Sequence, residues 1–220
     1  MTGKAKPSDP SSGEGADEPV DSVVQGCPCQ LPSKLPKNPE SAPDEIQLPK
    51  EVDESMQESF KNSFPGGKSQ ERGATLVKGL KGKIKVVHES AGDSGSFSPN
   101  RQVGFFQTIV GTYHTHPYDA SEGGHKGVSF SGGDIAYSIH HDEPVVVDAG
   151  DKQFIIMPTK ETPDVSSKTI NDEWDAEFYN GLNAKKSMQE ASADASKTMA
   201  KKYKMVYYDG DNGNFKKHDL

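Results

Sequence analysis

The sequence predicts an α+β fold in which a small mixed or antiparallel β-sheet is flanked by helices. Short β-branched and aromatic runs alternate along the chain with stretches of helical periodicity, and clusters of Gly, Pro and Ser separate them. Strands and helices interspersed in this way pack as layers around one core. The predicted order is a helix, three strands, a helix, two strands, a helix and a last strand.

Residues 1–50 differ in composition from the rest of the chain. They hold nine of the fifteen prolines and no Phe, Trp or Tyr, so they cannot bury enough apolar surface to offset the entropy of ordering their backbone. We therefore predict a disordered Pro-rich leader over residues 1–50 and one folded domain over residues 51–220. Cys27 and Cys29 fall in the leader and cannot build a disulfide framework. A metal site, a redox handle, free thiols and a docking peptide all stay open for this pair.

The elements of the folded domain follow from local patterns. Apolar residues recur at helical spacing from Val52 to Phe64, and Pro65-Gly66-Gly67 ends this first helix. Further helices are expected from Asp134 to about His140 and over residues 171–202, the second with a candidate break at Gly181. Strands are expected over residues 74–77, 83–88, 105–113, 145–148 and 153–157, with a last strand and turn over 205–215.

The composition also excludes several classes of protein. The formal net charge is −8, whereas non-specific binding of nucleic acid needs clustered Lys and Arg, so we expect no nucleic-acid partner. The mean hydropathy is −0.78, and no apolar run approaches the roughly 18 residues that indicate a membrane span. The N-terminus shows no apolar signal segment. This pattern predicts a protein that is cytoplasmic, or exported without an N-terminal signal peptide.

The segment after the third predicted strand carries the candidate chemistry. That strand runs directly into His114-Thr115-His116, and residues i and i+2 of a strand face the same side, so both imidazoles can reach one ion. Ser131-Gly-Gly-Asp134 opens the next helix, a pattern that is also a capping box. Asp134 would thus approach the histidine pair from a second element. Two imidazoles and one carboxylate are three ligands, one short of the four of a zinc tetrahedron.

This pattern resembles the motif of the JAMM (JAB/MPN) zinc metalloproteases, which is His-x-His-Pro followed by Ser-x-x-Asp. The matching residues are His114, His116, Pro117, Ser131 and Asp134. The resemblance implies a JAB/MPN-like α/β sandwich and a Zn²⁺ ion held by the two histidines and the aspartate. It also implies hydrolysis of a peptide or isopeptide bond by water that the ion activates.

The resemblance further implies a role for Ser131 and for an upstream glutamate. Ser131 would stabilise the oxyanion of the tetrahedral intermediate, and the glutamate would act as general base. Two glutamates compete for that role. Glu71 precedes the first predicted strand with a small residue soon after it, as in the family, and it is preferred over Glu89 at the far end of the next strand.

The chain departs from the family pattern between the two halves of the motif. Residues 117–130 separate His116 from Ser131, a longer spacing than is usual, and the excess is Gly-rich. This insert is either a flexible flap over the cleft or a tolerated surface insertion. His125 within it is either an additional ligand or substrate contact, or a solvated loop residue.

The motif is most similar to a bacterial JAB-like branch found in secreted effectors and toxins. That likeness implies a protein or peptide substrate, and a secretion apparatus, an immunity protein or a chaperone as a partner of the leader. The substrate can be ubiquitin-like, a cell-wall peptide or another chain. Two other classes stay open: a non-catalytic MPN-like module that binds proteins, and a different metal hydrolase, such as an amidase or nuclease, acting as a toxin.

Overall fold

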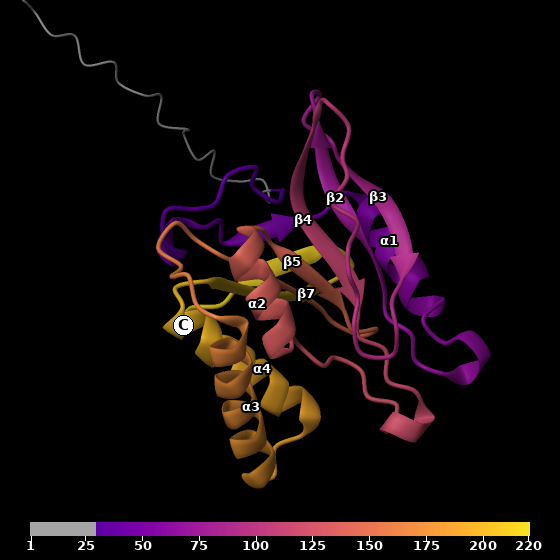
Figure 1. Cartoon of the computed structure of the whole chain (residues 1–220), viewed down its shortest axis with the longest axis vertical. Helices are drawn as coiled ribbons and strands as arrows, with labels where there is room; N and C mark the ends of the chain where they lie inside the picture. Colours follow the sequence, from indigo (N-terminus) through magenta and orange to yellow (C-terminus); the bar gives the residue numbers. More distant parts are fainter. Residues whose placement is uncertain (1–29) are drawn as a thin grey trace, which may run out of the picture.

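The computed structural model describes residues 30–220 and confirms the α+β fold. Figure 1 shows one curled sheet with helices on both of its faces. Residues 1–29, which make up most of the predicted leader, lie outside the described part of the chain. No helix among the described residues is long and apolar enough to cross a membrane.

The sheet of the described chain has eight strands in the order β1-β8-β7-β6-β5-β4-β2-β3. The strands are β1 (Glu45–Gln47), β2 (Arg72–Gly79), β3 (Ile84–Ala91), β4 (Gln107–Thr115), β5 (Val145–Asp148), β6 (Gln153–Met157), β7 (Val206–Asp211) and β8 (Asn214–Lys217). The helices are α1 (Lys50–Lys61), α2 (Gly132–His141), α3 (Ser167–Asn183) and α4 (Met188–Lys202), with short 3₁₀ turns at Pro39–Ser41, Pro65–Gly67 and Ala120–Glu122.

The direction of the strands explains where α2 begins. β4 and β5 run parallel, whereas the other neighbouring strands run antiparallel, so the sheet is mixed. Parallel neighbours need a crossover connection. The chain therefore leaves the end of β4, returns through α2 and starts β5, whose first residue Val145 pairs with Thr112 of β4. This crossover brings the first turn of α2 close to the end of β4.

Strand alternation divides the core into two layers. In β5, Val145 and Val147 pack toward α2, α3 and α4, whereas Val146 packs on the opposite face with α1. On the first face, Trp174 and Phe178 of α3 stack with ring centroids 4.8 Å apart. Each face of the sheet is thus covered by helices.

Residues 30–50 belong to the fold, so the prediction of a leader is wrong over this range. β1 pairs with β8, with Ile46 opposite Phe215, and Leu31 and Leu48 are buried in the same core layer. The low apolar content misled the prediction because β1 adds to the edge of a sheet that already exists. A short strand there gains backbone hydrogen bonds and needs few apolar side chains of its own.

The predicted long helix over residues 171–202 is in fact two helices. The break lies at the turn between α3 and α4, where Ser187 caps α4 in a capping box with Glu190. Gly181 lies inside α3, and a Cβ on it would come 2.9 Å from the Cβ of Ala191 in α4. This glycine therefore allows α3 and α4 to pack closely and does not end the helix. The predicted last strand is likewise a hairpin, formed by β7 and β8.

The segment 30–50 can be tested by a single substitution in β1. Ile46 is fully buried, so Ile46→Ala should lower the free energy of unfolding by roughly 2–5 kcal/mol. Glu45 in the same strand is largely exposed, so Glu45→Ala should change it by less than about 0.5 kcal/mol. Urea unfolding followed by circular dichroism measures both. Equal stabilities for the two variants would contradict the pairing of β1 with the sheet.

Candidate metal centre

Strand geometry places the two histidines on one face of the sheet. His114 in β4 and His116 directly after it point to the face opposite Tyr113, whose hydroxyl contacts Ser55 and Ser59 of α1. Gly73 in β2 lies opposite His114. A Cβ on Gly73 would lie 2.9 Å from the Cα of His114 and 2.2 Å from the carbonyl oxygen of Tyr113, so only glycine lets the two strands approach this closely.

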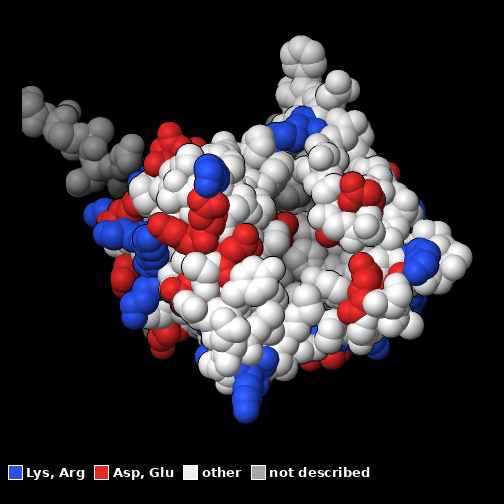
Figure 2. All heavy atoms as spheres, turned by 60° about the horizontal axis from the view of Figure 1, so that its bottom comes forward, with Lys and Arg blue, Asp and Glu red and all other residues white. Residues whose placement is uncertain are grey.

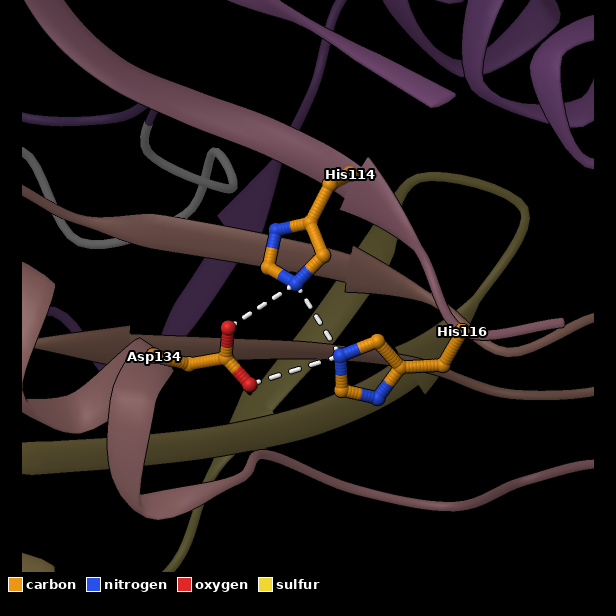
Figure 3. Close-up of side chains that lie close together, drawn as sticks. All are labelled: His114, His116 and Asp134. Carbon is orange, nitrogen blue, oxygen red and sulfur yellow. Dashed lines mark hydrogen bonds and ion pairs between the residues drawn. The ribbon is translucent and has the colours of Figure 1, made fainter. Parts of the chain in front are cut away.

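Three donor atoms converge between β4 and α2 (Figure 3). Nε2 of His114 lies 3.0 Å from Nε2 of His116 and 3.0 Å from Oδ1 of Asp134. Nε2 of His116 lies 3.3 Å from Oδ2 of Asp134. A tetrahedral ion with bonds of about 2.0–2.1 Å separates its ligand atoms by about 3.3 Å. The predicted ligand set is therefore assembled, and it could hold a metal ion.

An outer contact fixes the orientation of the His116 ring. Its Nδ1 lies 3.1 Å from the carbonyl oxygen of Ser129 and 3.3 Å from that of Val128. A carbonyl only accepts hydrogen bonds, so Nδ1 carries a proton, which leaves Nε2 as the nitrogen that can bind a metal ion once it is unprotonated. Outer contacts of this kind orient metal-binding imidazoles.

Ser131 and Asp134 form the predicted capping box at the start of α2. The N–H of Asp134 donates to Oγ of Ser131 at 3.2 Å, while the N–H and the Oγ of Ser131 donate to Oδ2 of Asp134 at 2.7 and 2.8 Å. The cap therefore does two things at once. It begins the helix, and it holds the Asp134 carboxylate toward the imidazoles.

Asp134 and the two histidines interact electrostatically. Burial alone would raise the pKa of Asp134, but the charges and hydrogen bonds of His114 and His116 hold it well below its usual range. Burial alone would lower the pKa of His116, but its hydrogen bond to Asp134 and the charge of that group raise it. A metal ion binds the unprotonated imidazole, so an ion at this site would compete with protons for the two Nε2 atoms.

A cleft of about 210 Å³ opens beside the donor atoms, and Glu71, His114, Ser131 and Asp134 line it together. The other lining residues are Gly95, Ser96, Phe97, Pro99, Thr112, Gly133, Tyr137 and Val145. Figure 2 turns this end of the molecule toward the reader, and the surface is hollowed near the centre of the view. The predicted base, the predicted oxyanion residue and two of the three predicted ligands, His114 and Asp134, therefore line one cleft.

Backbone contacts fix Glu71 at the wall of this cleft. Its N–H donates to the carbonyl of Asp93 at 2.7 Å, and its carbonyl accepts the N–H of Gly92 at 2.8 Å. The residue is 8% exposed, and burial raises the pKa of its carboxyl despite the opposing charges of His114 and His116.

Glu89, the competing glutamate, lies on the other face of the sheet. Its carboxylate accepts a hydrogen bond from Ser55 of α1, and it is not among the residues that line the cleft. The geometry therefore favours Glu71 over Glu89 as the group that can act at the donor atoms.

The insert of residues 117–130 is anchored at both ends. Near its start, the N–H of Asp119 donates to Oγ of Ser69 at 2.7 Å, and the N–H of Ser69 donates to Oδ2 of Asp119 at 3.2 Å. Near its end, Phe130 is buried in the core. Of the residues described, those lining the cleft include none from the insert. The geometry thus favours a surface insertion over a flap.

His125, the one histidine of the insert, does not belong to the candidate metal centre. Its ring packs edge-on against Tyr118 with ring centroids 6.0 Å apart.

Phe97 is a site residue that the sequence reasoning missed. Its ring stacks on His114 with centroids 6.2 Å apart and an interplanar angle of 16°. It is the one aromatic residue in the Gly/Ser-rich loop between Ser90 and Arg101. A single aromatic side chain in such a loop indicates that the loop packs against another part of the protein, because a fully solvated loop is not stabilised by an aromatic ring.

Comparison of the chain with protein-family models, with curated proteins and with solved structures finds no significant match. The interpretation of this centre therefore depends on its own geometry and chemistry.

The metal centre makes a direct prediction about ion binding. His114→Ala removes one of three donors and should weaken Zn²⁺ binding by more than the 10- to 100-fold that losing an outer contact costs. His125→Ala is the matched control and should bind one equivalent as tightly as the unchanged protein. Titration against a chromogenic chelator measures both. Tight binding by His114→Ala would exclude the three residues as the ligand set.

Proposed function

We propose that the protein is a zinc-dependent hydrolase that cleaves peptide or isopeptide bonds in the manner of the JAMM metalloproteases. The observation that carries this proposal is the shared cleft, which Glu71 lines together with His114 and Asp134. A site that only bound metal for stability would have a closed ligand shell and no need of a buried acid beside it.

The donor set supports zinc as the ion. Two imidazoles and one carboxylate are a common protein ligand set of catalytic zinc sites, and they leave one position open. When bound, zinc polarises a substrate carbonyl and lowers the pKa of water, which is the chemistry that amide hydrolysis needs.

Glu71 is suited to the proton transfers of such a reaction. Burial raises the pKa of its carboxyl, and a base whose pKa moves toward neutral pH accepts a proton more readily. In the proposed reaction it takes a proton from the attacking water and delivers that proton to the nitrogen of the leaving amine. Backbone hydrogen bonds to residues 92 and 93 hold the main chain of Glu71 at the wall of the cleft, which keeps its side chain beside the site for both steps.

Ser131 and the start of α2 are suited to stabilise negative charge on the substrate oxygen. The first N–H groups of a helix have no partner within the helix and carry partial positive charge. Gly133 in this first turn lines the cleft together with Ser131. In the proposed reaction the Ser131 hydroxyl turns its proton from Asp134 toward the oxyanion, which strengthens a contact made only in the transition state.

The role of Glu71 is tested by a charge-neutral substitution of similar size. Glu71→Gln should bind one equivalent of zinc with unchanged affinity, while its kcat/KM should fall by about 10²- to 10⁴-fold, the usual contribution of a positioned general base. The assay uses a panel of peptide, isopeptide and muropeptide substrates with a chelator control.

Glu89→Gln is the matched control for this test, because Glu89 lies on the opposite face of the sheet. It should retain both zinc and activity. Full activity in Glu71→Gln, or loss of activity in Glu89→Gln alone, would overturn the assignment of the base.

A further inference from the structure

A second unusual surface lies at the opposite end of β4 from the metal centre. Four apolar side chains project there: Leu80 is 82% exposed, Val103 37%, Phe105 102% and Phe106 69%. We name these four residues the apolar tip. In Figure 1 this part of the molecule, where β2 turns into β3 and β4 begins, is at the top.

Two adjacent turns build the apolar tip. The N–H of Gly82 donates to the carbonyl of Gly79 at 2.9 Å, which puts Leu80 at a corner. The N–H of Gln107 donates to the carbonyl of Gly104 at 3.0 Å, which puts Phe105 and Phe106 at both corners of the second turn.

The two turns are neighbours, because Gly79 pairs with Gln107 in the β2–β4 ladder. Turn corners are usually occupied by Gly, Pro, Asn, Asp or Ser. Two exposed phenylalanines and a leucine at such corners therefore serve no purpose in the turns themselves.

Lysines lie beside the apolar tip on the hairpin of β2 and β3. Lys78, Lys81, Lys83 and Lys85 lie in the two strands and the turn that carry Leu80, and we call them the basic collar. Residues 76–88 contain no Asp or Glu, although the whole chain has a net charge of −8. Within the described chain, none of the four lysines forms an ion pair.

We propose that the apolar tip and the basic collar dock the protein on a membrane surface that carries anionic lipid headgroups. Apolar side chains on a convex tip can enter the boundary between headgroups and acyl chains, while lysines beside them meet the headgroup charge. A single-stranded nucleic acid fits less well, because Leu80 and Val103 offer no ring for a base to stack on. A protruding tip also offers no concave pocket for the anchor residues of a protein partner.

Docking at the tip leaves the cleft free. Gln107 at the tip and His114 at the metal centre are seven residues apart along β4, which corresponds to about 23 Å at the strand rise of 3.3 Å per residue. The same loop joins both places, since Phe97 stacks on His114 and Phe105 reaches the tip. The membrane site is thus separate from the proposed hydrolase and does not depend on it.

The experiment is sedimentation of the full chain with vesicles of phosphatidylcholine alone or with roughly 30 mol% phosphatidylserine. The protein should bind the anionic vesicles, bind the neutral ones weakly, and dissociate as salt is added. Phe105→Ser with Phe106→Ser should weaken binding by about 100-fold or more. Lys81→Gln, Lys83→Gln and Lys85→Gln together should weaken it by about 100-fold, at about fivefold for each lysine.

Matched controls change the same kinds of residue elsewhere. Tyr179→Ser alters an exposed aromatic of α3 that is 59% exposed, and Lys168→Gln, Lys186→Gln and Lys202→Gln remove three charges from α3, α4 and the turn between them. Both controls should bind vesicles like the unchanged protein. Because the substituted tip residues are exposed, the thermal midpoint of every variant should stay within a few degrees.

Three results would overturn the proposal. These are no binding to anionic vesicles, equal binding to neutral and anionic vesicles, or unchanged binding in the phenylalanine and lysine variants of the tip and collar. A dimer that Phe105→Ser with Phe106→Ser dissolves, without vesicle binding, would assign the tip to a second copy of the chain. Binding of a single-stranded oligonucleotide in place of vesicles would assign it to nucleic acid.

Discussion

The main constraint on this structure is the close approach of the metal-donor atoms of His114, His116 and Asp134 near the end of β4. Two imidazole nitrogens lie 3.0 Å apart with a carboxylate beside both, and lone pairs this close repel one another unless a proton or a metal ion lies between them. A bound metal ion would accept a lone pair from each of the three residues, so the imidazole nitrogens that face it would have to be unprotonated. The fold must hold the three residues close together, and several of its features do so.

Those features come from separate parts of the chain. The parallel pairing of β4 with β5 requires a crossover, and that crossover starts α2 beside His114 and His116. Gly73 lets β2 lie close against β4, which brings Glu71 to the same cleft. The capping box of Ser131 then aims the carboxylate of Asp134. A helix start, which any protein can use for stability, thus also serves to position a ligand.

The sequence could predict what depends on local pattern. Alternation along a strand put His114 and His116 on one face, and the cap pattern put Asp134 at a helix start, as observed. The sequence could not exclude Glu89 as the general base, because simple alternation does not tell which face of the sheet Glu89 lies on. The register between β2 and β3 shifts near this residue, and the preceding His88 has a φ of 57°. Nor could the sequence reveal β1, since a three-residue strand that pairs with the far end of the chain leaves no periodicity to detect.

We propose that His114, His116 and Asp134 bind one metal ion together. The most direct test is a crystal structure of zinc-loaded protein with anomalous diffraction measured above and below the zinc absorption edge. We expect a single anomalous peak about 2.0–2.1 Å from Nε2 of both histidines and from an Asp134 carboxylate oxygen. A peak elsewhere on the protein, with the three side chains still joined only by hydrogen bonds, would contradict it.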